Sequence, residues 1–119
     1  MATMEREKKA VAATIAWAHD DLSLAYGEIG LAVEADERTV RRWHGMETAP
    51  RGSHREKLES FRELRHLLET VFESQLEAED WLHSSVPALR GRTPISAVRR
   101  GHVDAVVGIL ATMESGAYS

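Results

Sequence analysis

The chain has 119 residues, of which 43% are hydrophobic and 29% charged, and its formal net charge is −4 at pH 7. These values predict a globular protein of one domain or two small lobes that share a core. Cysteine is absent, which excludes disulfides, cysteine metal sites and a thiol nucleophile. No apolar run approaches a membrane span, and residues 1–10 lack the apolar stretch of a secretory signal, so we expect no membrane association and a cytoplasmic location.

The first half of the chain predicts three helices. Residues 5–20 form the first, because apolar residues recur on one helical face: Val11, Ile15, Ala18 and Leu22. A second helix is expected from an N-cap at Ser23 to Val33. Its inward positions are Ala25, Ile29, Ala32 and Val33. After a turn at residues 34–36, Asp36 is expected to cap a short helix over residues 37–44.

The second half predicts four more helical segments and completes an all-α fold. A loop over residues 45–52 precedes a long helix, capped by Ser53 and ending near Glu73, with Leu64 or Arg65 among its inward positions. Shorter helices are expected over residues 76–83 and 95–100, the latter after Thr93 as N-cap and Pro94 at the first helical position. Gly101 separates the last helix, over residues 102–114. We expect Trp43, Phe61, Leu68, Trp81 and Leu110 to be largely buried.

The small net charge conceals alternating blocks. Residues 1–36 and 59–80 sum to −4 and −5, whereas residues 37–58 and 81–119 sum to +3 and +2. The acidic total argues against nonspecific coating of nucleic acid, yet a local basic block can supply a phosphate footprint. Such blocks also occur as solvated faces with no partner.

Residues 24–43 have the spacing of a helix-turn-helix. Ile29 and Val33 would pack the first helix, Gly30 would leave room for the second to cross close by, and Val40 and Trp43 would bury the inner face of the second. The outer face could then enter a DNA major groove. The predicted DNA contacts, including the loop that follows, are Arg38, Thr39, Arg41, Arg42, Arg51 and Arg55.

Two features weaken this interpretation, so an ordinary helical hairpin with a solvated basic face remains an alternative. The turn lacks the glycine that is commonly expected there. Glu37, at the start of the second helix, would also repel phosphate.

A second constellation lies between Trp81 and Gly116. The sequence WLHSSVPALRGRTPISAVRRGHVDAVVGILATMESG has a Trp-Leu pair, a loop with proline, leucine, glycine and proline, and then Gly and Asp ahead of an apolar helix. This pattern resembles the toxin-binding domain of the Xre/MbcA/ParS antitoxins, and AYGEIGLAVEADERTVRRW is similar to the helix-turn-helix of that family. The motif positions are Trp43, Trp81, Leu82, Leu89, Gly91, Pro94, Gly101 and Asp104.

The resemblance covers residues 24–116 and implies a type II antitoxin. It implies a helix-turn-helix domain over residues 1–72, a toxin-binding domain over residues 73–119, and a RES-domain toxin partner that consumes NAD or transfers ADP-ribose from it. It also implies autorepression through operator DNA, and a homodimer or a larger toxin–antitoxin complex. The alternative is a helix-turn-helix regulator whose C-terminal lobe only dimerises.

Within residues 73–119, arginine provides the expected toxin contacts, because its planar fork pairs with carboxylates and its stem packs on apolar surface. The expected residues are Arg90, Arg92, Arg99 and Arg100, together with Tyr118 and Ser119 of a C-terminal tail that could enter an anion-binding toxin pocket. A tail with no role is the alternative.

Enzyme interpretations are weak. No pair of histidines has zinc-ligand spacing, and neither a nucleophile elbow nor a phosphate loop occurs. His19, Asp20 and Asp21 could ligate a metal, but a solvated helix end is the favoured interpretation of these residues. We therefore expect no catalytic residue, no metal and no cofactor.

Overall fold

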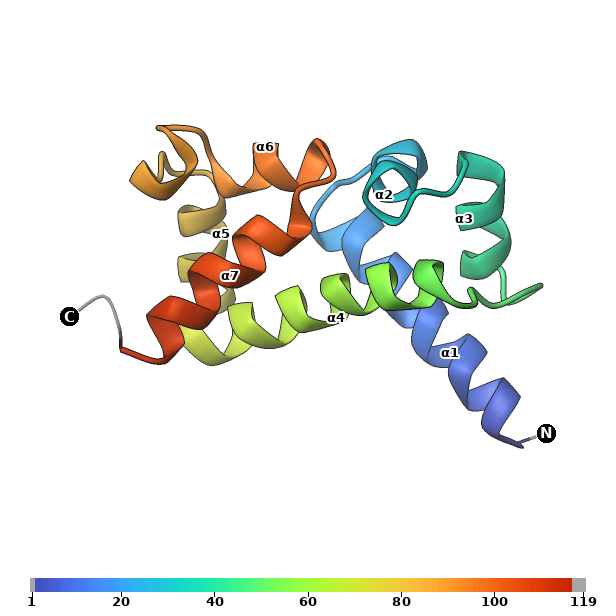
Figure 1. The fold of residues 1–119 in the computed structure, drawn as a ribbon. Coiled ribbons are helices and arrows are strands. Elements are labelled where there is room, and N and C mark those ends of the chain that lie inside the picture. Colours follow the sequence, from blue (N-terminus) through green and yellow to red (C-terminus); the bar gives the residue numbers. More distant parts are fainter. Residues whose placement is uncertain (1, 117–119) are drawn as a thin grey trace. The chain divides into compact units, whose positions relative to one another are not determined.

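The computed structural model describes residues 2–116, and every regular element in that range is helical (Figure 1), which confirms the all-α prediction. The elements, in chain order, are α1 (Ala2–Ala16), the π-helical η1 (Trp17–Asp21), α2 (Tyr26–Val33), α3 (Glu37–His44), α4 (Ser53–Val71), α5 (Gln75–Leu82), the 3₁₀ turn η2 (Pro87–Leu89), α6 (Pro94–Arg99) and α7 (Val103–Glu114). Two units follow, unit 1 up to residue 59 and unit 2 from residue 60, with the boundary inside α4.

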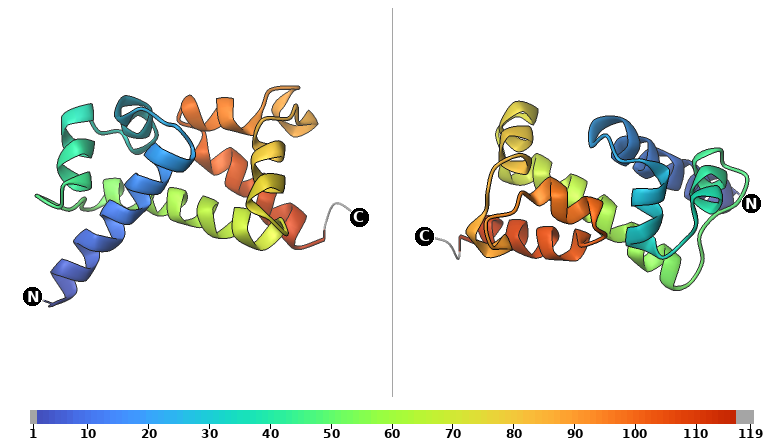
Figure 2. Two further views of the ribbon diagram at one scale, coloured as in Figure 1. Left: turned by 180° about the vertical axis from the view of Figure 1, so that it is seen from behind. Right: turned by 90° about the horizontal axis from the view of Figure 1, so that it is seen from above.

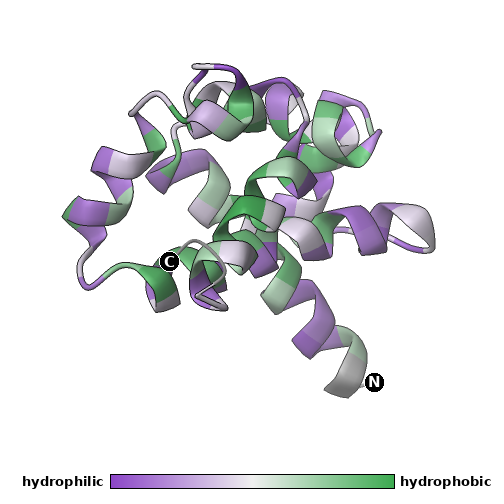
Figure 3. Ribbon diagram, turned by 60° about the vertical axis from the view of Figure 1, so that its left-hand side comes forward, coloured by the Kyte–Doolittle hydropathy of each residue, from purple (hydrophilic) through white to green (hydrophobic). Residues whose placement is uncertain are grey.

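The core of unit 1 forms where α1, α2 and α3 meet. The four predicted inward residues of the first helix, Val11, Ile15, Ala18 and Leu22, are all buried. The helix continues through η1 to Asp21, so it ends within one residue of the expected position. The part of α1 nearest the N-terminus is coloured mainly hydrophilic in Figure 3, in agreement with its run of charged residues.

The predicted start of the second helix was wrong. Ser23 has a φ of 57° and caps nothing, and the N-cap of α2 is the exposed Ala25. Glu28 supplies the missing cap, since its carboxylate accepts the Ala25 N–H at 2.8 Å. The reason is Leu24, which is 1% exposed, because burying this side chain delays the helix until after residue 25.

The long helix also differs at both ends. Ser53 is its first residue and not its cap, because the Gly52 carbonyl accepts the Glu56 N–H at 3.2 Å. The helix ends at Val71, two residues earlier than expected. Leu64 is the inward residue, whereas Arg65 is exposed.

Unit 2 is completed by α5, η2, α6 and α7. Figure 2 shows α6 and α7 next to each other, and these two helices are in contact. Thr93 caps α6 through the Ser96 N–H at 3.2 Å with Pro94 at the first helical position, as predicted. Gly101 has a φ of 89°, a left-handed conformation that suits glycine in the tight turn to α7.

Four of the five residues expected in the core are buried: Trp43, Phe61, Leu68 and Leu110. The expectation for Trp81 was wrong, because this side chain is only half-buried. It lies at the end of α5 against Phe72, with 5.6 Å between the ring centroids, and Phe72 is itself half-buried. Within residues 2–116 no helix is long and apolar enough to cross a bilayer.

Candidate functional site

The connection between α2 and α3 is the three-residue turn that the sequence predicted. Glu34 has a φ of 59° and occupies the left-handed position where glycine is common. The Ala35 N–H donates to the Gly30 carbonyl at 2.9 Å and closes the turn. The missing glycine is therefore no obstacle, since Glu34 adopts this conformation itself.

Gly30 is required by a close approach of the backbone. A Cβ at this position would lie 2.4 Å from the Ala35 carbonyl oxygen. The sequence predicted that the second helix crosses close to Gly30, whereas the nearest atoms belong to the turn itself. Gly30 thus allows the tight turn that orients α3.

Asp36 is the N-cap of α3, as predicted. Its Oδ1 accepts the Thr39 N–H at 2.7 Å. Hydrogen bonding from Thr39 lowers the pKa of Asp36, and the positive charges of Arg38 and Arg42 act in the same direction. The carboxylate also suits the positive end of the α3 dipole.

The two faces of α3 separate as expected. Val40 is 0% and Trp43 3% exposed, so the inner face is buried. Arg38, Arg41 and Arg42 are exposed, while Thr39 is half-buried. The arginines can therefore reach a partner.

Arg41 is held by residues of its own unit. Its Nη2 lies 2.7 Å from Glu37 Oε1, and its guanidinium lies 4.8 Å from the centre of the Tyr26 ring. The hydrogen bond and the charge of Glu37 raise the pKa of Arg41.

Tyr26 also stacks on His19, with 4.3 Å between the ring centroids, and its hydroxyl lies 2.8 Å from His44 Nδ1. This cluster of residues from η1, α2 and α3 was not predicted from the sequence. No spacing rule links its members, because they are distant in sequence.

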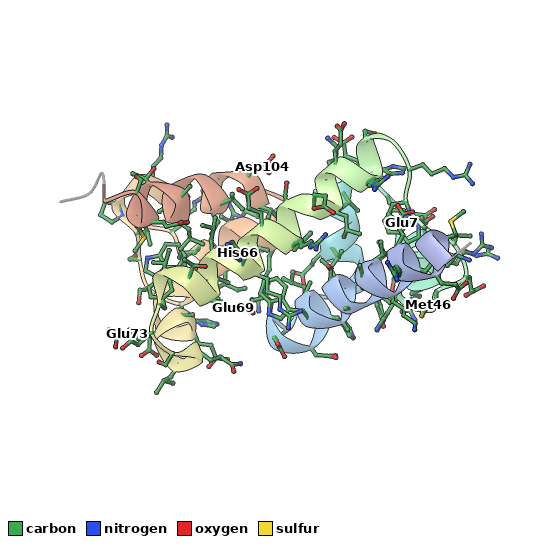
Figure 4. All side chains as sticks on the ribbon, turned by 90° about the horizontal axis from the view of Figure 1, so that it is seen from below. Glu7, Met46, His66, Glu69, Glu73 and Asp104 are labelled. Atoms are coloured by element: carbon green, nitrogen blue, oxygen red, sulfur yellow. The ribbon has the colours of Figure 1, made fainter. Side chains whose placement is uncertain are left out.

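The other two predicted DNA contacts, Arg51 and Arg55, lie elsewhere in unit 1. Both line a cavity of about 480 Å³, together with Lys8, Glu7 and Glu47. Arg55 Nε lies 3.4 Å from Glu7 Oε1, and Figure 4 shows Glu7 on α1. This cavity is therefore of mixed charge.

In unit 2, a loop closed by hydrogen bonds precedes α6 and carries two of the basic residues. The Val86 N–H donates to the Arg92 carbonyl at 3.1 Å, and the Gly91 N–H donates to the Val86 carbonyl at 3.2 Å. The Ser85 hydroxyl donates to the Gly91 carbonyl. Arg90 has a φ of 58°, and Gly91 follows with a φ of 83°. These bonds hold Arg90 and Arg92 on one short stretch of backbone.

The same loop forms one side of a pocket of about 390 Å³. Its apolar lining residues are Ala88, Leu89, Ala97 and Ala105. Its basic lining residues are Arg90, Arg92, Arg100 and His102. Within residues 2–116, none of the three arginines forms an ion pair with a carboxylate. The structure thus gathers three of the four predicted arginines, and Arg99 is exposed outside the pocket lining.

The remaining motif residues support this arrangement. Leu82 and Pro94 are buried, and Leu89 is half-buried. Asp104 accepts a hydrogen bond from the Ser60 hydroxyl at 2.7 Å and thereby links α7 to α4 (Figure 4). Tyr118 and Ser119 lie outside the described residues.

The possible metal ligands near the end of the first helix do not gather. Among residues 2–116 no group of three or more His, Asp or Glu side chains could hold a metal ion. Instead, His19 Nδ1 forms a hydrogen bond with the Leu24 carbonyl oxygen, at a distance of 2.7 Å. Its role within the described structure is therefore to pack and hydrogen-bond.

Residues 67–116 match the family model described as the antitoxin Xre/MbcA/ParS C-terminal toxin-binding domain. Over this range the chain is therefore similar to the Xre/MbcA/ParS antitoxins. The matched range contains the loop, the pocket and α5 to α7, so the resemblance seen in the motifs is confirmed.

Curated relatives agree with this assignment. The chain is 28% identical over 108 residues to the mycobacterial cidal antitoxin MbcA of Mycobacterium tuberculosis and of Mycobacterium bovis, which covers 91% of this chain and 95% of the relative. It is also similar to a chain in the crystal structure of the M. tuberculosis MbcT–MbcA toxin–antitoxin complex. That similarity has a TM-score of 0.56 at 28% identity and covers 91% of this chain and 96% of the other.

Proposed function

We propose that this chain neutralises a toxin by binding it, as the antitoxin of a type II system. The main support is the match of residues 67–116 to a toxin-binding domain, combined with similarity to MbcA over nearly its whole length. The family resemblance further suggests a RES-domain toxin that consumes NAD or transfers ADP-ribose. We assign toxin binding to residues 73–119 and the helix-turn-helix to residues 1–72.

The pocket of unit 2 is the proposed centre of the toxin interface. Arg90, Arg92 and Arg100 surround apolar side chains and lack carboxylate partners within the described residues. Arginine is enriched in interfaces because it combines a planar charged fork with an apolar stem. A toxin surface that presents a carboxylate beside an apolar side chain would complement this pocket, and Arg99 would extend the contact.

Co-expression with the product of the neighbouring reading frame tests this proposal. Arg92→Glu plus Arg100→Glu should abolish growth rescue and weaken toxin binding at least tenfold. Arg38→Glu plus Arg42→Glu makes the same change of charge in unit 1 and should retain both properties. Full rescue by the first variant would place the interface elsewhere, whereas failure of the unaltered chain to neutralise any neighbouring product would refute the antitoxin function.

The C-terminal tail is a separate proposal. Tyr118 and Ser119 would enter a toxin pocket built for an anionic dinucleotide. An aromatic side chain is a rigid contact of the kind that often dominates an interface. Deletion of residues 117–119 should then reduce rescue and affinity. Undiminished rescue would leave the arginine surface to block the toxin alone.

A second proposed function is repression of the operon through α2 and α3. Its support is the exposed basic face of α3 above a buried inner face. If the chain were instead a regulator whose C-terminal lobe only dimerises, it would bind its promoter but would not rescue cells from any neighbouring toxin. Promoter binding and growth rescue measured on the same preparations separate the two functions.

A further inference from the structure

The pocket of unit 2 requires an occupant with two properties. Its four apolar lining residues favour contact with an apolar side chain, and Arg90, Arg92 and Arg100 favour ion pairs with carboxylates. None of its lining residues is acidic. Its volume of about 390 Å³ exceeds that of a single leucine side chain and falls in the range of about 300–1,000 Å³ typical of ligand pockets.

The same unit presents a side-chain cluster with these two properties on α5. Leu76 is 68% exposed, which is more than any other large hydrophobic residue within residues 4–116. Glu79 and Asp80 follow at i+3 and i+4, so they share its face of the helix. Ala78 and Leu82 are buried on the opposite side. Neither carboxylate forms an ion pair within the described residues.

We propose that the arginine pocket of one copy receives Leu76 of a second copy, with Glu79 and Asp80 pairing with the arginines around the pocket. Charge complementarity within one sequence supports the choice of a second copy. Residues 59–80, which include this acidic face, sum to −5, and residues 81–119, which include the pocket, sum to +2. Leu76 does not line the pocket of its own chain and remains exposed, so its own copy leaves both surfaces available.

This contact joins different surfaces of the two copies. Such a heterologous contact leaves one acidic face and one pocket free at the ends, and it can therefore continue from copy to copy. The ion pairs lie at the rim, so salt should weaken the association. One consequence rests on the proposed function: self-association would occupy the arginines that we assign to the toxin and would have to open before the toxin binds.

Site-directed crosslinking tests the pairing directly, because the chain has no cysteine of its own. Gln75→Cys lies next to Leu76, and Arg99→Cys lies next to Arg100 without lining the pocket. A mixture of these two variants, treated with a short bismaleimide, should give a crosslinked dimer. Each variant alone should give much less. Addition of Leu76→Ser to the Gln75→Cys chain should remove the product.

Two crosslinking outcomes would overturn the proposal. Equal crosslinking of Gln75→Cys with itself would indicate contact between like surfaces. Equal crosslinking of Leu31→Cys with Arg99→Cys would indicate random encounters, because Leu31 is an exposed leucine of unit 1. Circular dichroism should show native helicity for every variant.

A mixing experiment gives an independent test by sedimentation. Leu76→Ser has lost the protruding side chain but keeps the pocket, whereas Arg92→Glu plus Arg100→Glu has lost the pocket but keeps Leu76. The unaltered chain should increase in mass with its concentration, and each variant alone should lose this increase; an unaltered chain of constant mass would overturn the proposal. Their mixture should recover a one-to-one pair and nothing larger through this contact. An unchanged increase in mass for either single variant would overturn the proposal, and since no toxin is present, this result is separate from the fate of the antitoxin function.

Discussion

The basic side chains of the two units differ in what surrounds them. In unit 1, Arg41 is paired with Glu37 and covers Tyr26, and Arg55 is paired with Glu7. In unit 2, Arg90, Arg92 and Arg100 surround apolar residues and have no carboxylate partner within the described residues. The basic blocks, residues 37–58 and 81–119, have similar net charges of +3 and +2. Within the described residues, the pocket lined by three arginines without carboxylate partners lies in the second block.

This difference shows that a charge count does not identify a binding surface. A paired arginine must give up its carboxylate before it binds a phosphate, although exposed pairs contribute only about 0–1 kcal/mol. An unpaired arginine beside apolar surface loses no such partner. We therefore expect the local environment of the arginines to decide which basic block binds tightly.

The largest expected effect concerns the two tryptophans of the family pattern. Trp43 in unit 1 is 3% exposed and packs beside His54 with 5.7 Å between the ring centroids, whereas Trp81 in unit 2 is half-buried. Trp43→Ala should lower the free energy of unfolding by about 3–5 kcal/mol, as is typical for buried aromatic residues, and Trp81→Ala by less. Urea unfolding followed by circular dichroism measures both.

Trp81→Ala also tests the proposed toxin interface of unit 2. If this variant retains native helicity and still fails to neutralise, its aromatic ring is itself a toxin contact. If it unfolds as completely as Trp43→Ala, the half-buried position contributes far more than its exposure suggests, and the contrast between the units is wrong.

These tryptophans illustrate what the sequence could establish. Helical periodicity predicted the fold class and most inward residues, because burial of an apolar face depends on local spacing. Exposure of Trp81 depends on its partner Phe72, nine residues earlier and across a helix end. The start of α2 was missed for a similar reason, since burial of Leu24 overrides the capping preference of Ser23.

The candidate sites were predictable to different degrees. The inner and outer faces of α3 follow from spacing alone, and the structure has them as expected. The pocket of unit 2 does not, because it joins residues of η2, α6 and α7 through a loop closed by backbone hydrogen bonds. The ion pairs of Arg41 with Glu37 and of Arg55 with Glu7 were also not predictable, because helix spacing permits the first pair without requiring it and does not indicate the second.

The next largest effect is expected from substitution of Gly30, which should destabilise unit 1 and leave unit 2 unchanged. Gly30→Ala places a Cβ against the Ala35 carbonyl oxygen and should destabilise unit 1 by about 1–3 kcal/mol. Promoter binding should fall while toxin binding persists. Gly108→Ala in α7 is the matched control, because nothing lies within 4 Å of its Cβ and alanine favours a helix. Equal effects of the two substitutions would contradict the assigned role of Gly30.

A smaller effect should distinguish the arginines of α3. Arg42 forms no ion pair within the described residues, so Arg42→Ala should reduce the salt dependence of promoter binding by about one phosphate contact. Arg41→Ala should reduce it less, because Glu37 already neutralises this charge. Glu37→Gln should strengthen binding by releasing Arg41 and removing a negative charge. If Arg41→Ala combined with Arg42→Ala leaves affinity and salt slope unchanged, α3 does not contact DNA.

The smallest expected effect is a change in stability at low pH, and it arises because the two units cap their helices with different groups. In unit 1 the cap of α3 is the ionisable Asp36, which accepts the Thr39 N–H at 2.7 Å. In unit 2 the caps of α5 and α6 are neutral hydroxyls, Ser74 at 3.1 Å from the Glu77 N–H and Thr93 at 3.2 Å from the Ser96 N–H. Only the first cap can be weakened directly by protonation.

Hydrogen bonding from Thr39 lowers the pKa of Asp36 below its ordinary value of 3.8, so the folded state favours the carboxylate. The resulting stabilisation is complete above that ordinary value and is lost as the pH falls through the lowered pKa. Asp36→Asn keeps a capping oxygen but cannot ionise, so it should be less stable than the unaltered chain near neutral pH, and the difference should be smaller at pH 2. Urea midpoints at the two pH values measure this difference.

Thr93→Ser is the control in unit 2, and its difference from the unaltered chain should be the same at both pH values. A constant difference for Asp36→Asn would show that ionisation of Asp36 contributes nothing to the stability of α3.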